Sequence, residues 1–217
     1  MLKTFHTDTF ADILTLQTRT NALLGGATFL ASSSTIYNAL SHSHPQLLEL
    51  LARPIWPFDS RGTFLPSTTR PLLHRHDGRV LLNFAREPLL GLDGVRRASG
   101  VGVLSAEQRK ALDVLEEVAA RNQIRVRARP GDVLFVNNHA VLHSREGFVD
   151  GGERPRYLVR MWLRNPEMAW RLPQGALREG NERIYGEDSG SGAGEEGVWN
   201  VVDAPRVRFR LSERLTS

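Results

Sequence analysis

Apolar and polar positions alternate along much of this chain with the period of two that is typical of strands. The segments with this pattern predict strands at residues 2–8, 11–18, 27–32, 80–84, 123–129, 132–137, 140–144 and 156–163. Gly25-Gly26 and Gly131-Asp132 lie between such segments and predict turns, the second of a hairpin type. Many short strands with a few helices favour a mainly β fold with flanking helices, either a β-sandwich or a jelly roll.

Three segments depart from the strand pattern and predict helices. Residues 33–40 begin with serines that can cap a helix, and residues 44–51 begin with His-Pro, which suits a first helical turn. Ser105 and Gln108 have the spacing of a capping box, so we expect a third helix from there to about Asn122.

The remaining segments set the expected domain limits. Residues 54–71 contain four prolines and predict a long loop or lid rather than a regular element. Residues 186–197 (GEDSGSGAGEEG) have low complexity and predict a flexible segment. We therefore expect one domain over residues 1–185, then this segment, then a tail over residues 198–217.

Composition narrows the class of protein. The 217 residues are 41% hydrophobic and 24% charged, as in an ordinary globular domain with a real core. No apolar run approaches the roughly 20 residues of a membrane span, and the first residues lack the pattern of a signal peptide. We expect a cytoplasmic protein without a membrane partner. Cysteine is absent, so a bound metal must use histidine and carboxylate ligands.

The formal charge of +4 does not indicate a nucleic-acid partner. The most basic stretch, residues 121–129, has four arginines but no interleaved aromatic residues, and it follows Glu116 and Glu117. A solvated helix end and strand edge explains it better. The sequence is compatible with a homo-oligomer.

The candidate chemistry begins at His6-Thr7-Asp8. On an extended strand, two residues in an H-x-D pair lie on the same face. A second histidine from a distant strand would complete a set of two histidines and one carboxylate, which is diagnostic of non-haem Fe(II) oxygenases. His139 and His143 both qualify, because residues four apart share a strand face.

Longer stretches around these residues resemble the TauD/TfdA family of Fe(II)/2-oxoglutarate-dependent dioxygenases. The stretch FHTDTFADILTLQTRTNALLGGATFLASSSTIYNAL resembles the family's metal-binding region. GDVLFVNNHAVLHSREGFVD and RPRYLVRMWLR resemble its distal-histidine and arginine strands, and PQLLELLARPIWPFDSRG resembles the helix and linker of fungal members. The resemblance runs from about Phe5 to Arg164.

The resemblance implies a double-stranded β-helix, which is a cupin-like jelly roll, with Fe(II), 2-oxoglutarate as co-substrate, and O2. It implies that His6 and Asp8 are the first two metal ligands. The family's N-x-x-V-L-H pattern selects His143 as the third, which leaves His139 as an exposed turn residue.

The resemblance also implies how 2-oxoglutarate is held. Arg156 matches the arginine that pairs with the distal carboxylate, although Arg154 is a local rival. Thr28 matches a threonine that helps to hold the same carboxylate, while a plain strand residue explains it equally well. Arg160 matches an arginine near the substrate, which favours an anionic small molecule.

Four further assignments are less specific. Asn83 could line the substrate pocket, and Trp162 lies in an apolar run that favours the core. The pair at residues 42–44 and the stretch at residues 74–77 also carry histidines, but their polar context favours solvated loops.

Two alternatives to an active dioxygenase remain. Family members normally carry a substantial segment before the H-x-D motif, whereas five residues precede it here. We therefore expect that this chain is a fragment, less stable and less active than a longer form, or an inactive member of the same fold that binds a metal or ligand. The second alternative is a cupin-like binder that holds another metal without oxidation.

Overall fold

The computed structural model describes residues 3–59, 67–91, 97–151 and 155–186. The expected flexible segment beyond Gly186 and the tail at residues 198–217 lie outside the described residues. The strands of the described residues are β1 Lys3–His6, β2 Ile13–Thr20, β3 Leu24–Gly25, β4 Thr28–Ser32, β5 Trp56–Phe58, β6 Thr68–Arg70, β7 Leu73–His76, β8 Arg79–Leu82, β9 Ile124–Val126, β10 Val133–Asn137, β11 Val141–Arg145, β12 Phe148–Val149 and β13 Tyr157–Leu163. The helices are α1 Ser33–Ser43, α2 Pro45–Ala52, α3 Arg86–Leu90, α4 Ala106–Arg121 and α5 Ala176–Tyr185.

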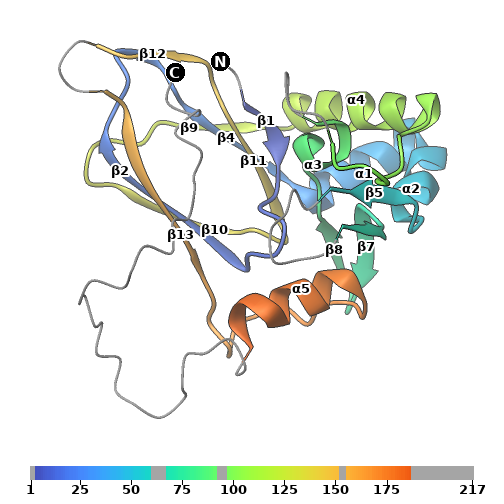
Figure 1. The fold of residues 1–217 in the computed structure, drawn as a ribbon. Coiled ribbons are helices and arrows are strands. Elements are labelled where there is room, and N and C mark those ends of the chain that lie inside the picture. The colour runs from blue at the N-terminus through green and yellow to red at the C-terminus, as the bar shows by residue number, and fades with distance from the viewer. Residues whose placement is uncertain (1–2, 60–66, 92–96, 152–154, 187–217) are drawn as a thin grey trace. The chain divides into compact units, whose positions relative to one another are not determined.

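Two antiparallel sheets form the centre of the fold (Figure 1). The first has the strand order β1-β11-β4-β9, and the second has the order β10-β2-β13. Both orders join strands that are distant in sequence, as a jelly roll requires. Gly131 has φ 98° and forms the expected turn, but the expected hairpin is wrong: β9 pairs with β4 and β10 pairs with β2, so the turn joins the two sheets.

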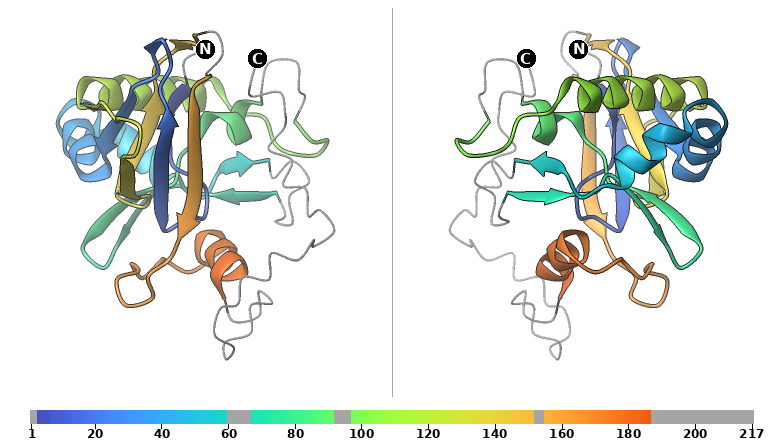
Figure 2. Two further views of the ribbon diagram at one scale, coloured as in Figure 1. Left: turned by 90° about the vertical axis from the view of Figure 1, so that its left-hand side faces the viewer. Right: turned by 90° about the vertical axis from the view of Figure 1, so that its right-hand side faces the viewer.

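Helices α1, α2 and α4 gather on one side of the strands, and their apolar faces fill the main core (Figure 2). The capping box at the start of α4 is confirmed, with Ser105 Oγ accepting from Gln108 N and Gln108 Oε1 accepting from Ser105 N. The cap of α1 is Ser32, one residue before the two expected serines. Among the described residues, no helix is both long and apolar enough to cross a bilayer.

The proline-rich stretch at residues 54–71 differs from the expected irregular loop. Its two ends, β5 and β6, pair antiparallel, with Trp56 opposite Arg70. Trp56 is fully buried and Phe58 nearly so, and this burial holds the segment in place. Pro57 is tolerated because a two-stranded sheet consists of edge strands. Residues 60–66, the middle of the expected lid, lie outside the described residues.

Candidate metal centre

The pairing of β1 with β11 makes His6 and His143 direct cross-strand neighbours. One extra residue in β1, between Lys3 and His6, shifts the register and aligns the two histidines. Their ring centroids lie 4.0 Å apart, with the ring planes at 47°. Two histidines separated by most of the chain therefore meet on one face of the first sheet, which no short-range pattern in the sequence could specify.

Asp8 lies beyond the end of β1, so the expectation that the whole H-x-D pair lies on a strand is wrong. After His6 the backbone no longer pairs with β11: Thr7 N donates to Phe84 O at 2.7 Å, and the backbone of Asp8 bonds to a side chain. Asp8 N donates to Asn138 Oδ1 at 2.8 Å, and Asn138 Nδ2 donates back to Asp8 O at 2.6 Å. The carboxylate still reaches the histidines, with Asp8 Oδ1 4.0 Å from His6 Nε2.

The hydrogen bonds of the histidines leave ring nitrogens available to a metal. His6 Nδ1 lies 2.9 Å from Thr4 O, and since a carbonyl can only accept, Nδ1 carries the proton and Nε2 keeps a lone pair. His6 Nε2 and His143 Nδ1 are both buried, and neither has a hydrogen-bond partner among the described residues. Buried nitrogens of this kind are costly unless something binds them.

Electrostatics keep the histidines neutral and the carboxylate charged. Burial, followed by repulsion from His143 and Lys3, lowers the pKa of His6 well below its usual value. Burial lowers the pKa of His143 to about 4, against the attraction of Asp8. Burial works to raise the pKa of Asp8, but Arg160, His143 and the Trp162 hydrogen bond outweigh it, so that pKa is lowered. Metal ligands need these protonation states.

The donor set fits a metal ion. His6, Asp8 and His143 are buried and offer three ligand atoms that all lie within 4.8 Å of one another. Among the residues that the structure describes, no other three histidine or acidic side chains converge in this way. Two imidazoles and one carboxylate on one side of a site leave the remaining positions of an octahedral iron for other ligands.

His139 does not join this set, and it is not the exposed turn residue that the sequence favoured. It lies in the turn between β10 and β11 but is only 4% exposed. Its Nε2 lies 2.8 Å from Asp12 Oδ1, which gives the ring a partner in the protein. His139 is buried because the carboxylate of Asp12 is buried as well and needs hydrogen-bond donors.

Trp162 belongs to the site rather than to the core, where the sequence put it. The side chain is 43% exposed, yet its Nε1 donates to Asp8 Oδ2 at 2.8 Å. Arg160 approaches the other oxygen, with Nη1 3.5 Å from Asp8 Oδ1, and its guanidinium also lies over the Trp162 ring. The apolar residues around Trp162 in the sequence therefore led to a wrong prediction, because the indole N–H has a polar partner in Asp8.

Positive charge collects at the far end of the first sheet. Arg156, just before β13, donates from Nη2 to Gly26 O at 3.3 Å, close to Thr28 in sequence. Gly26 has φ +77°, a conformation that favours glycine, and a Cβ there would lie 3.0 Å from Arg156 Nε and push that side chain slightly away. Arg154, the rival of Arg156, lies outside the described residues.

Arg145 shares this end of the sheet, and we did not predict it. Its guanidinium lies 4.6 Å from the Phe148 ring centroid, and that of Arg156 lies 5.3 Å from the same centroid. Burial, followed by repulsion from Arg145, lowers the pKa of Arg156. Two neighbouring arginines favour the binding of an anion such as a carboxylate. The available signal was the spacing of two from His143, which puts Arg145 on the same strand face.

The other candidates have partners inside the protein. Asn83 is 4% exposed and donates from Nδ2 to Thr9 O at 2.5 Å, so only its Oδ1 lacks a hydrogen-bond partner among the described residues. His42 is exposed, as expected, whereas His44 is partly buried. His74 differs from the expected solvated residue because burial, with Arg70 and His76, lowers its pKa to about 4.

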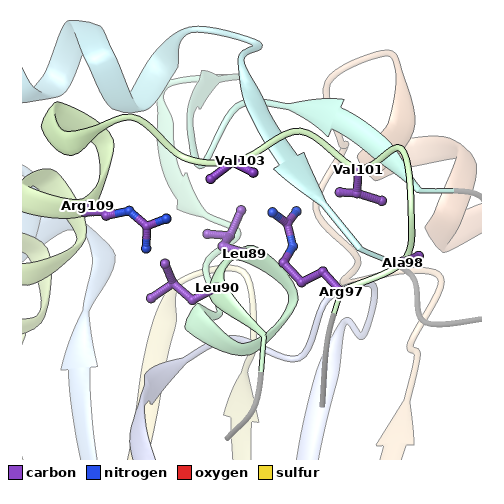
Figure 3. Close-up of a pocket in the computed structure, with 7 residues that line it drawn as sticks. All are labelled: Leu89, Leu90, Arg97, Ala98, Val101, Val103 and Arg109. Carbon is purple, nitrogen blue, oxygen red and sulfur yellow. The ribbon is translucent and has the colours of Figure 1, made fainter. Parts of the chain in front are cut away.

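A separate pocket of about 350 Å³ involves none of these residues. It is lined by Leu89, Leu90, Arg97, Ala98, Val101, Val103 and Arg109. Figure 3 shows Arg97 and Arg109 on opposite sides of the two leucines. None of the three candidate metal ligands lines this pocket.

Comparison with known families identifies the class. The model of the "Taurine catabolism dioxygenase TauD, TfdA family" matches residues 1–162, and the chain belongs to this family. The family expected from the sequence is therefore confirmed. The taurine hydroxylase-like protein SAT17 of Stachybotrys chartarum is 36% identical over 205 residues, which are 94% of this chain and 52% of that protein. FR-33289 synthase of Streptomyces rubellomurinus is 32% identical over 180 residues, 73% of this chain and 48% of that protein.

Solved structures share the fold. Asparagine oxygenase in complex with Fe(II), 3-hydroxyasparagine and succinate aligns with a TM-score of 0.55 and 19% identity, over 75% of this chain and 50% of that one. The non-haem iron oxygenase OrfP in complex with Fe aligns with a TM-score of 0.54 and 20% identity, over 75% and 51%. These likenesses confirm the expected fold class. The chain spans about half the length of the curated relatives that it matches.

Proposed function

We propose that this chain is an Fe(II)- and 2-oxoglutarate-dependent dioxygenase that oxidises a small molecule, with His6, Asp8 and His143 as the iron ligands. The observation that carries the proposal is the convergence of three buried ligand atoms within 4.8 Å, two of them on neutral histidines. Family membership and solved relatives in complex with iron and α-ketoglutaric acid support the same chemistry.

We assign the distal carboxylate of 2-oxoglutarate to Arg156, with Thr28 beside it. Two arginines near Phe148 support this assignment, because a half-buried guanidinium gains from a bidentate anionic partner. Arg145 adds charge at the same place. Its position on β11, two residues after His143, links the anion end to the candidate metal end along one strand.

Bound iron with 2-oxoglutarate supplies the oxidation of a C–H bond by O2, with release of succinate and CO2. The chain's own residues orient and insulate this chemistry. Trp162 and Arg160 hold the two oxygens of Asp8, and Asn138 holds its backbone. Each support limits the freedom of the carboxylate before any metal arrives, and ligand positions must be held within about 0.5 Å for function.

For the substrate we propose a small anionic molecule, bound near Arg160. The side chain of Arg160 is one-third exposed beside Asp8, so it can contact a ligand that approaches the metal. Solved relatives hold hydroxyasparagine and hydroxyarginine, which support a carboxylate contact rather than a net negative charge, so the anionic character rests on Arg160 alone. A cytoplasmic location stays a prediction of the sequence.

The test is addition of Fe(II) and then 2-oxoglutarate to the protein without oxygen. We expect a weak visible charge-transfer band in the wild type and none in His143→Ala. Exposure to O2 should then convert 2-oxoglutarate to succinate. If no band forms in the wild type, the proposal is wrong.

The inactive alternative has one observation in its favour, the approach of Arg160 to Asp8 Oδ1 at 3.5 Å, which offers the carboxylate a partner other than a metal. Under that alternative neither the band nor succinate appears. The same experiment therefore distinguishes the two functions.

A further inference from the structure

Three buried asparagines hold the segment that carries Asp8. Asn83 follows β8, Asn138 lies in the turn between β10 and β11, and Asn181 lies in α5. They are 4%, 1% and 3% exposed, respectively. We call this set the asparagine cradle.

The cradle binds four consecutive carbonyls. Asn138 Nδ2 donates to Asp8 O at 2.6 Å and to Ala11 O at 2.7 Å. Asn83 Nδ2 donates to Thr9 O at 2.5 Å. Asn181 Nδ2 donates to Phe10 O at 2.9 Å. Side chains from three distant parts of the chain thus give each of these carbonyls a donor.

The carbonyls need such donors because the segment is not part of a sheet. β1 ends at His6 and β2 begins at Ile13, so the residues between them have no strand partner. Asp8 and Ala11 are buried and Thr9 and Phe10 partly buried, so a carbonyl left here without a donor would destabilise the fold. The asparagines therefore supply the hydrogen bonds that no neighbouring strand gives to this segment.

Asn181 has a second bond that ties α5 to the same segment. Its Nδ2 also donates to Asp12 Oδ1 at 2.8 Å, the oxygen that His139 Nε2 approaches at the same distance. Arg164 Nε lies 3.4 Å from Asp12 Oδ2. Both hydrogens of the Asn181 amide are used, one on each side of Ala11.

Close packing independently places α5 against this segment. Gly180 lies so near to Phe10 that a Cβ would come within 2.3 Å of the ring, so glycine is required there. The family match ends at residue 162, and α5 begins at Ala176, beyond that match.

We propose that α5 supports the metal centre and that Asn181 is a positioning residue for Asp8, acting through Phe10 and Asp12; this rests on the proposed function above. The proposal also gives Asn83 a positioning role in place of the substrate contact expected from the sequence.

The test is the affinity of Asn181→Ala for Co(II), a divalent probe that does not react with O2 under the assay conditions. Loss of a residue that orients a ligand typically weakens metal binding by about 10–100-fold, and we expect at least about tenfold here. The d–d absorption of bound Co(II), which reports ligand geometry, should change shape. Thermal unfolding of the metal-free protein is measured alongside.

Arg178→Ala is the matched control, because Arg178 lies on the exposed side of α5 and pairs with Glu182. It should bind Co(II) with wild-type affinity and spectrum. If Asn181→Ala does not fold, Asn181→Ser, which keeps one donor, takes its place and should give an intermediate loss of affinity.

The outcomes separate this inference from the proposed function. If the wild type binds no Co(II), the metal site itself is wrong and the role of Asn181 falls with it. If the wild type binds Co(II) and Asn181→Ala binds it equally well with the same spectrum, only the positioning role is wrong. A lower unfolding temperature with unchanged affinity also overturns it, because that result describes a structural residue.

Discussion

Trp162 Nε1 donates a hydrogen bond to Asp8 Oδ2 at 2.8 Å, across 154 positions of the sequence. The two carboxylate oxygens therefore have different surroundings: Oδ2 meets the indole, and Oδ1 lies 4.0 Å from His6 Nε2. The indole orients the carboxylate and stabilises its charge.

Trp162→Phe should weaken Fe(II) or Co(II) binding by about tenfold, because it keeps the ring but removes the donor to a charged group, a contribution of about 1.5–3 kcal/mol. The loss should grow as the pH falls, since the same donor helps to lower the pKa of Asp8. Isothermal titration at two pH values measures both effects. Trp56→Phe, which likewise removes an indole donor but one that bonds to Leu50 O in the main core, is the control and should bind metal normally.

His143→Ala should abolish specific metal binding, whereas His139→Ala should keep it with reduced affinity. The first change removes one of three proposed ligands. The second leaves the ligands in place and removes a partner of Asp12, which weakens the support of the segment that carries Asp8. Metal content after dialysis against Fe(II) or Co(II) distinguishes the variants. Metal retention in His143→Ala together with loss in His139→Ala would reverse our assignment.

Arg156→Ala should weaken 2-oxoglutarate binding by about tenfold or more while Fe(II) affinity stays constant, because a charge-assisted hydrogen bond contributes about 1.5–3 kcal/mol. Titration of the charge-transfer band without oxygen gives both constants. Arg125→Ala is the control, since Arg125 lies near this end of the sheet but pairs with Glu146. Unchanged 2-oxoglutarate affinity in Arg156→Ala would move the role to Arg145 or Arg160.

Stability should fall on acidification between about pH 6.5 and pH 4, and His74 should contribute to the fall. Burial, with Arg70 and His76, lowers the pKa of His74 to about 4. In this window the unfolded chain binds a proton that the folded chain does not, so acid favours unfolding, by up to about 3 kcal/mol for this group.

His74→Gln should therefore flatten the dependence of unfolding free energy on pH in that window. The slope should not vanish, because burial also lowers the pKa of His143 to about 4. Urea unfolding at pH 7, 6, 5 and 4.5 measures it. His42→Gln, at an exposed position in α1, should keep the wild-type slope, and equal slopes for all three proteins would contradict the prediction.

Local patterns in the sequence predicted most regular elements, and the resemblance to the family supplied the candidate metal ligands. The capping box of Ser105 and Gln108 depends on neighbours three residues apart, and it is confirmed. The family pattern around His143 chose between two histidines that alternation could not separate. Family and fold class are confirmed by the comparisons. The roles of the site residues stay predictions.

Several of the errors involve contacts between distant segments. Trp162 was predicted to lie in the core because its hydrogen-bond partner, Asp8, is far away in the sequence. His139 reads as exposed because its partner is Asp12. Asn181 has no motif, and its two bonds to residues 10 and 12 exist only once α5 has folded against that segment. Hydrogen bonds between side chains so far apart in sequence leave no periodic pattern from which they could be predicted.

The register of β1 against β11 has a consequence for folding kinetics. His6 becomes the neighbour of His143 only after a strand at the start of the chain pairs with one more than a hundred residues away. Closing so long a loop is slow, and the complete ligand set is absent until it happens. A metal that binds this set should therefore slow the unfolding limb of a chevron plot and leave the refolding limb almost unchanged. The ion would stabilise the fold after it has formed and would not speed its formation.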